Sequence, residues 1–171
     1  LITTLGPQQF VGILHDFGLN NPDIDRNATP VLSLGPCEVS VGEMVSAYTA
    51  FANGGVRCAP MFVTKIEDSH GNVIAKFQPL MTEVISEDNS YRMIDMMRAV
   101  IDGGTGGRLK GAYGMKGDIC GKTGTTNAAG HCLILLSRDT SGAPYISVIL
   151  NSSASDVLYP EMVQLLEQIN K

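Results

Sequence analysis

Residues 121–126 read Gly-Lys-Thr-Gly-Thr-Thr and bring one amine, three hydroxyls and two glycines together. On an extended strand, side chains two residues apart share a face, so Thr123 and Thr125 point one way and Lys122 the other. Two hydroxyls with nearby backbone N–H groups can hold a carboxylate or an acyl oxyanion. Gly124 lets another backbone approach closely, and an edge strand can take up an extended peptide. The segment therefore suits acyl transfer on a peptide substrate.

A phosphate-binding loop is the main rival interpretation, because the pattern G-x-x-x-x-G-K-[ST] ends as Gly121-Lys122-Thr123 does. The first glycine of that pattern falls on Lys116, and Gly117 comes one position too late. The loop also leads into a helix, whereas Thr125-Thr126-Asn127 is typical of a strand that ends in a turn. We therefore reject it. A merely solvated surface strand is the simplest interpretation of Lys-Thr-Gly taken alone.

Helices are predicted where apolar residues recur every three or four positions. They follow Gly6-Pro7, Ser40 and either Ser86 or Asp88, and a last helix starts near Pro160. Ser40-Val41-Gly42-Glu43 forms a capping box at the start of the second helix. Prolines with Asn and Asp between residues 19 and 38 indicate a loop.

Strands are predicted in two groups. Residues 62–66 and 73–77 flank a turn and form a hairpin. Residues 118–126, 131–137 and 145–150 follow one another through short turns and form an antiparallel meander of three strands. The first of these carries the Lys-Thr-Gly sequence. The fold class is therefore α/β, with an antiparallel sheet flanked by helices.

The composition is that of an ordinary globular chain of 171 residues, 44% hydrophobic and 17% charged, for which one domain is expected. The net charge of −5, without a locally basic stretch, argues against nucleic-acid binding. No apolar run approaches the roughly 20 residues that a membrane helix needs. The chain opens on Leu1 rather than Met, so we expect a piece of a longer protein.

Neither the cysteines nor the histidines have the spacing of a metal site, so no metal and no cofactor is expected. No C-x-x-C occurs, and the histidines fall in three different segments. Cys120 is interpreted as a small core residue rather than a reactive thiol. His131 is interpreted as a polar edge residue rather than a base. The full set is Cys37, Cys58, Cys120, Cys132, His15, His70 and His131.

Several long stretches resemble the transpeptidase domain of class A penicillin-binding proteins, the bifunctional peptidoglycan synthases. Lys-Thr-Gly is one motif of this group and of class A β-lactamases. The similar stretches are Val31–Gly55, Phe62–Ile74, Met93–Gly107 with its Gly104-Thr105-Gly106 loop, and Gly121–Asn127. The resemblance spans roughly residues 5–127 and implies the C-terminal part of a penicillin-binding protein or serine β-lactamase-like fold.

After Asn127 the chain looks more like the D-alanyl-D-alanine carboxypeptidases. The stretch that carries this likeness is Ala128–Ile134, together with Tyr145–Leu150. We therefore expect residues 1–171 to form a partial transpeptidase domain with a composite junction near residue 127.

The resemblance assigns roles to the strand. Lys122 and Thr125 would be catalytic: Lys122 supports the nucleophile, and the Thr125 N–H provides half of the oxyanion hole. Thr123, Gly124, Thr125 and Thr126 would bind substrate, with Thr123 and Thr125 holding the terminal carboxylate of a peptide or a β-lactam. Because alternation separates Lys122 from the threonines, a twist or a bulge must bring them to one site.

Two further motifs of the family are missing. No serine stands three residues before any lysine, so Ser-x-x-Lys is absent, and Ser-x-Asn is absent too. A serine acylation site needs nucleophile, base and oxyanion hole together. Three hypotheses follow: the C-terminal part of a D,D-transpeptidase, a D-alanyl-D-alanine carboxypeptidase, or an inert fragment or chimera.

The expected partners are the peptidoglycan stem peptide, β-lactam antibiotics and, as one source of the missing serine, a separate chain carrying the N-terminal half. No nucleic acid is expected. By the same resemblance, the site of action is the periplasmic face of the bacterial inner membrane, with the parent protein anchored there.

Overall fold

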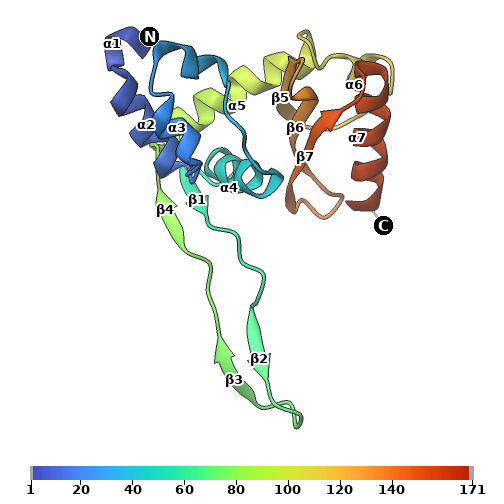
Figure 1. Cartoon of the computed structure of the whole chain (residues 1–171). Helices are drawn as coiled ribbons and strands as arrows, with labels where there is room; N and C mark the ends of the chain where they lie inside the picture. Colours follow the sequence, from blue (N-terminus) through green and yellow to red (C-terminus); the bar gives the residue numbers. More distant parts are fainter. Residues whose placement is uncertain (1, 170–171) are drawn as a thin grey trace. The chain divides into compact units, whose positions relative to one another are not determined.

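The computed structural model describes residues 2–169 and divides them into two compact units, whose elements are labelled in Figure 1. The first unit comprises the described residues up to Ala50 together with Val56–Val84. The second comprises Phe51–Gly55 and the residues from Ile85 onward. Each unit has a hydrophobic core of its own.

Short helices build the core of the first unit around Val11, Ile24 and Leu32. The helix predicted after Gly6-Pro7 and the one after the capping box are both confirmed. Ser40 Oγ accepts from the Glu43 N–H at 3.2 Å, and the Glu43 carboxylate accepts from the Ser40 N–H at 2.8 Å. The Ser40 N–H and, at 2.7 Å, the Ser40 hydroxyl both donate to the Glu43 carboxylate, and these two bonds lower the pKa of its carboxyl group. The elements are α1 (Ile2–Leu5), α2 (Pro7–Asp16), α3 (Pro22–Arg26), the 3₁₀ helix η1 (Pro30–Leu34) and α4 (Val41–Ala52).

The prediction of a loop between residues 19 and 38 is wrong, since α3 and η1 lie there. Pro22 and Pro30 each stand at the start of a helix, where a proline is compatible with helical geometry. Asn21 caps α3 by accepting a hydrogen bond from the Asp23 N–H at 2.9 Å. The residues that suggested a loop are therefore helix-starting residues.

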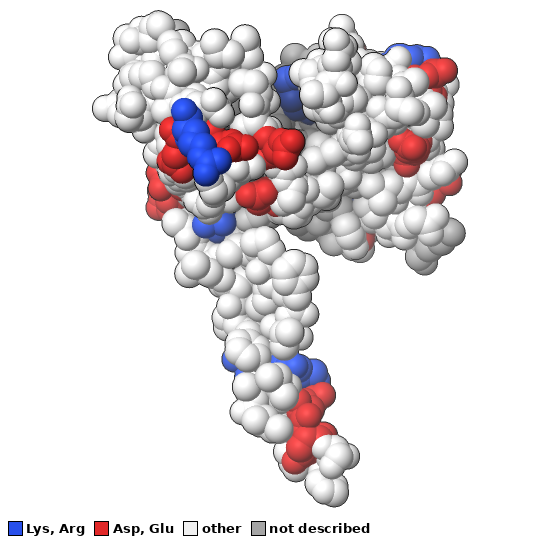
Figure 2. Space-filling model, in the orientation of Figure 1, with Lys and Arg blue, Asp and Glu red and all other residues white. Residues whose placement is uncertain are grey.

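Paired strands form an arm in the first unit (Figure 1). β2 (Lys65–Glu67) pairs with β3 (Val73–Lys76), which confirms the predicted hairpin. β1 (Val56–Cys58) and β4 (Met81–Glu83) also pair, and three residues each are too few for a periodic signal. Figure 2 shows the arm as mostly uncharged, with charged side chains near its tip, and large apolar side chains such as Phe62 are exposed.

The second unit contains the predicted three-stranded meander, with strand order β5-β6-β7 and antiparallel pairing throughout. The α/β class with an antiparallel sheet flanked by helices is thus confirmed. The strands are β5 (Cys120–Thr126), β6 (Gly130–Arg138) and β7 (Pro144–Ser152), and the helices are α5 (Glu87–Asp102), α6 (Arg108–Gly111) and α7 (Ser155–Ile169).

The last helix begins at Ser155 rather than near Pro160. Its first turn is already closed before the proline, because the Leu158 N–H bonds to the Ala154 carbonyl at 2.9 Å. Pro160 removes a single intrahelical hydrogen bond, and the buried residues Leu158, Tyr159 and Met162 hold the helix on the sheet.

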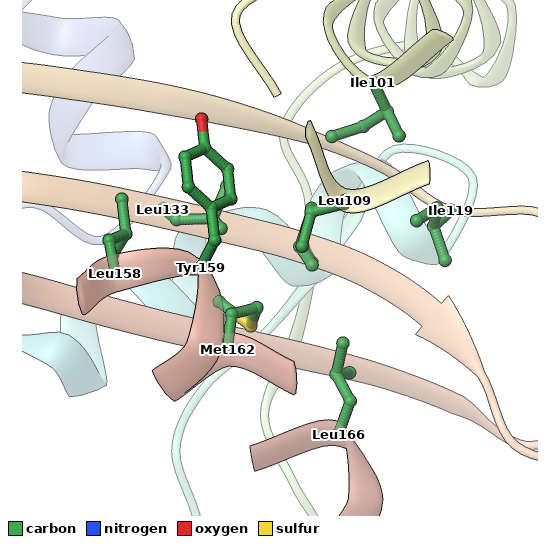
Figure 3. Packing of buried hydrophobic residues seen from close by; sticks show 9 residues of the cluster. Ile101, Leu109, Ile119, Leu133, Leu158, Tyr159, Met162 and Leu166 are labelled. Carbon is green, nitrogen blue, oxygen red and sulfur yellow. The ribbon is translucent and has the colours of Figure 1, made fainter. Parts of the chain in front are cut away.

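The core of the second unit lies between the sheet and α7 (Figure 3). Leu133 and Leu135 of β6 and Met162 of α7 have no solvent exposure. Ile134 and Leu136 are buried as well, so β6 is covered on both faces. The central strand thereby fixes the position of its neighbour β5. The cluster comprises Ile101, Leu109, Ile119, Leu133, Leu135, Leu158, Tyr159, Met162 and Leu166.

A bidentate ion pair connects α5 to the residues that precede β5. Arg98 Nε lies 3.0 Å from one Asp118 carboxylate oxygen, and Arg98 Nη2 lies 2.8 Å from the other. The hydrogen bonds from Arg98 hold the pKa of the Asp118 carboxyl below its ordinary value of 3.8.

Acidification is expected to remove the contribution of this ion pair to stability. Because the folded-state pKa of Asp118 is lowered, the contribution is complete above about pH 4 and is lost as the pH falls through the folded value. The side chains are 41% and 65% exposed, so screening limits the effect to about 1 kcal/mol or less. Urea unfolding should show a difference between wild type and Asp118→Asn at pH 7 that shrinks at pH 3. An equal difference at both values would contradict this role.

Candidate active site

β5 stands at the edge of its sheet. Its inner side pairs with β6 from Cys120 opposite Leu136 to Thr126 opposite Gly130. Among residues 2–169, no strand pairs with its outer side. β5 is therefore an edge strand within the described residues, and an extended chain has a strand beside which to lie.

The close backbone approach lies at Gly121 and not at Gly124. A Cβ on Gly121 would stand 2.1 Å from the Ile134 carbonyl oxygen and 2.7 Å from Leu135 Cδ2. A Cβ on Gly124 would meet only Cys132 Cβ, at 3.8 Å. Within this chain no backbone lies close to Gly124. Gly121 serves the packing of the sheet, and Gly124 leaves space above the strand.

Thr123 is held by the glycine loop that precedes the strand. Its hydroxyl is hydrogen-bonded to the hydroxyl of Thr105. The Thr105 carbonyl in turn accepts from the Tyr159 hydroxyl at 2.6 Å, and Tyr159 is buried in α7. Figure 3 shows the Tyr159 ring rising from α7 with its hydroxyl directed away from the apolar cluster. The position of the Thr123 hydroxyl is thus linked to the C-terminal helix.

Steric limits explain the glycines on either side of Thr105. A Cβ on Gly104 would lie 2.9 Å from Val100 Cα, and one on Gly106 would lie 2.7 Å from Ile101 Cδ1. The loop therefore packs tightly on the end of α5, and only residues without a side chain fit there. This packing presents Thr105 to Thr123.

Thr125 and Thr126 have different partners. The Thr125 hydroxyl lies 3.2 Å from Nδ1 of His131, the residue directly opposite on β6. The Thr126 hydroxyl accepts from the Ala129 N–H at 2.9 Å and so closes the turn into β6. The exposed Thr125 hydroxyl thus stands on the strand surface beside an imidazole, whereas the Thr126 hydroxyl is engaged in the turn.

Lys122 lies on the opposite face of the strand from Thr123 and Thr125. β5 and β6 pair without a register shift, so no bulge rotates the lysine toward the threonines. Its exposed side chain instead bends back, and Nζ donates to the Thr123 carbonyl. The four-carbon stem thus brings the amine back to the backbone of its own strand, and the alternation of faces is kept.

Cys120 is a core residue, as the sequence indicates. Its side chain is 6% exposed, and burial raises the pKa of its thiol to about 11. The thiol is therefore neutral at pH 7 and a poor nucleophile. No group of three or more His, Cys, Asp and Glu side chains in the described part of the chain is arranged to hold a metal ion. None of the described helices is both long enough and apolar enough to cross a membrane.

Comparison with known proteins identifies the strand and its surroundings. The family model of the penicillin binding protein transpeptidase domain matches residues 3–132. The chain belongs to the penicillin-binding protein transpeptidase family. The resemblance inferred from the sequence is thereby confirmed, and the Lys-Thr-Gly strand of this transpeptidase chain lies inside the matched region.

Curated relatives of the transpeptidase chain agree with this assignment. Penicillin-binding protein 1A of Clostridium novyi is 32% identical over 112 residues, covering 64% of this chain and 13% of the relative. Penicillin-binding protein 1A of Aquifex aeolicus is 38% identical over 96 residues, covering 56% of this chain and 13% of the relative. The chain thus spans only a small part of the length of these relatives.

Solved structures share the fold over most of the transpeptidase chain. Penicillin-binding protein 1A from Haemophilus influenzae aligns with a TM-score of 0.72 and 22% identity, covering 92% of this chain and 28% of that one. Penicillin-binding protein 3 from Mycobacterium tuberculosis, complexed with aztreonam, aligns with a TM-score of 0.70 and 21% identity, covering 95% of this chain and 46% of that one.

Two supports of the transpeptidase strand were not predicted. The sequence places Thr105 in a glycine loop, but nothing in it indicates that its hydroxyl meets Thr123. Tyr159 gives no signal either, since it is 54 residues away from the carbonyl that it contacts. The imidazole of His131 was considered as a base, and its contact with Thr125 was not foreseen.

Proposed function

We propose that this chain is the C-terminal part of a peptidoglycan D,D-transpeptidase and supplies one wall of its active site. The proposal rests on one observation above all: Lys122, Thr123 and Thr125 lie together on an exposed edge strand. A serine outside this chain attacks the penultimate D-Ala carbonyl of the stem peptide and expels the terminal D-Ala. The amine of an acceptor peptide then attacks the resulting ester and regenerates the serine.

Each predicted site residue has a part in this scheme. Thr123 and Thr125 donate their hydroxyl protons to the terminal carboxylate of the substrate. The Thr125 N–H stabilises the oxyanion together with the N–H of the serine. The Lys122 ammonium group supports the nucleophile by its charge and its proton. Gly124 leaves room for the substrate backbone, and Thr126 closes the substrate-binding strand.

β-Lactams fit the same wall, because they present an anionic group, a carboxylate or in monobactams a sulfonate, beside a reactive carbonyl. Such binding is supported by a neighbour of the same fold, the penicillin-binding protein 3 complexed with aztreonam. The substrate implies an extracytoplasmic site of action, which we propose to be the periplasmic face of the inner membrane. No cofactor takes part in the scheme.

The nucleophile must come from elsewhere, since Ser-x-x-Lys and Ser-x-Asn are absent from the sequence. We propose that an upstream segment or a separate chain supplies it. Residues 1–171 are then a partial transpeptidase domain with a composite junction near residue 127. The family match ends at residue 132, close to that junction. The second candidate function is D,D-carboxypeptidation, in which water hydrolyses the acyl-enzyme. It is supported by the likeness of the C-terminal tail to carboxypeptidases.

Labelling with a fluorescent penicillin, followed by mass spectrometry, tests the proposal. The complete transpeptidase domain should carry one covalent adduct on an upstream serine, and this chain alone should remain unlabelled. An adduct on a residue of this chain would contradict the proposal that the nucleophile lies outside it. An unlabelled complete domain would favour the inert fragment. Adding an acceptor amine to a D-Ala-D-Ala peptide separates a transpeptidase, which forms the amide, from a carboxypeptidase, which forms the free acid.

A further inference from the structure

We propose that His131 is a positioning residue for the carboxylate subsite. It acts through Thr125, whose hydroxyl it holds so that the hydroxyl proton points to the ligand. The proposal deepens the proposed function and rests on it for the identity of the ligand, a peptide or β-lactam with a free carboxylate. The contact between the two side chains stands on the structure alone.

The geometry places the two residues as one unit. His131 is paired with Thr125 across the β5–β6 ladder, so their side chains share a face of the sheet. His131 Nδ1 lies 3.2 Å from Thr125 Oγ1. The ring is partly buried, whereas Thr125 is exposed at the strand surface. A ligand that contacts the Thr125 hydroxyl therefore meets an oxygen whose other partner is an imidazole nitrogen.

The direction of this hydrogen bond decides what Thr125 can offer to a ligand. If Nδ1 carries a proton, it donates to Thr125 Oγ1, and the threonine proton is available to a carboxylate. If the neutral ring carries its proton on Nε2, Nδ1 accepts the threonine proton, and only an oxygen lone pair faces the ligand. Carboxylate binding at Thr125 therefore depends on a donor at the position of Nδ1.

The surroundings of the ring contain few other charges. On β5, Lys122 lies on the opposite face of the sheet. On β7, the residue paired with His131 is Ser152, whose hydroxyl donates to the Glu161 carboxylate of α7 at 2.8 Å. On β6, the neighbouring Cys132 thiol is directed to the Ala129 carbonyl. The Glu161 carboxylate is thus engaged by Ser152 in this arrangement.

Nuclear magnetic resonance of the 171-residue chain tests the contact without any activity. Long-range ¹H–¹⁵N correlations of the ring report which nitrogen carries the proton at pH 8. We expect the proton on Nδ1, and we expect its resonance to shift in Thr125→Val. A neutral ring protonated on Nε2 in the wild-type chain would overturn the positioning role.

Ligand titration tests the consequence. The probe is a diacetylated L-Lys-D-Ala-D-Ala tripeptide, and its C-terminal amide is the matched control without a carboxylate. The wild-type chain should bind the acid about tenfold more tightly than His131→Phe does, since a hydrogen bond to a charged group is kept. The amide should bind equally to both chains. Equal affinity of the two chains for the acid would overturn the proposal.

Two variants separate a specific role from a merely structural one. His131→Asn keeps an N–H near the position of Nδ1, so it should bind the acid within about twofold of the wild type. His131→Phe keeps a ring but lacks the donor, so its loss of about tenfold should be confined to the acid. A loss in His131→Asn as large as that in His131→Phe would overturn the proposal. Failure of the tripeptide to bind to the wild-type chain would instead refute the substrate site itself, and the ring-proton measurement distinguishes the two failures.

Discussion

Replacing Lys122 with Met should slow acylation of the complete transpeptidase domain by a β-lactam about 100-fold or more, the usual cost of losing one preorganised charged or donor group in an active site. Lys122 is exposed and its amine donates to a strand carbonyl, so the substitution removes a charge without opening a cavity. Met retains most of the aliphatic stem. The acylation rate is measured with a chromogenic cephalosporin under single-turnover conditions.

The matched control is Lys110→Met. Lys110 lies in the same unit and its amine pairs with Asp102 at 2.6 Å, away from the strand. This variant should acylate at the wild-type rate. A loss in Lys122→Met no larger than that in the control would refute the catalytic role proposed for Lys122.

Gly121→Ala should destabilise the second unit by about 3 kcal/mol, at the upper end of what overpacking usually costs. The added Cβ would stand 2.1 Å from the Ile134 carbonyl oxygen, which is backbone and cannot turn aside as a flexible side chain could. β5 and β6 must separate to admit it. Urea unfolding followed by circular dichroism gives the free energy of unfolding.

Gly124→Ala provides the comparison on the same strand. Its Cβ would be 3.8 Å from the nearest atom, an ordinary contact, so the free energy of unfolding should stay within about 1 kcal/mol of the wild type. Equal destabilisation of the two variants would show that the close approach at Gly121 does not limit the packing of the sheet. The pair thus separates the glycine needed for folding from the glycine proposed to face substrate.

Local signals in the sequence were sufficient for much of the fold. The meander follows from apolar runs separated by turn residues, and Ser40 with Glu43 marks a helix start by itself. The failures also have local causes. Pro22 and Pro30 suggested a loop because proline both interrupts and starts helices, and only the packing of Ile24 and Leu32 decides between the two.

The candidate site could be predicted only in part. The strand residues were identified because they are contiguous in the sequence and because residue type alone indicates the charge and hydrogen-bonding groups of their side chains. Their supports come from distant elements: Thr105 from the glycine loop and Tyr159 from α7. A hydrogen bond across such a separation leaves no periodic or compositional trace. The bulge predicted as one way to bring Lys122 to the threonines is absent from the β5–β6 register, and Lys122 stays on the opposite face of the strand.

The bond from Tyr159 to Thr105 has a consequence for shortened genes. A reading frame that stops after Ser152 would still encode the glycine loop and the whole Lys-Thr-Gly strand, so a motif search would score it as intact. Its product would lack α7, and with it the hydroxyl behind Thr105 and four of the nine buried side chains of the second core. For this family, the integrity of a gene is better judged by whether its last helix is present than by its motifs alone.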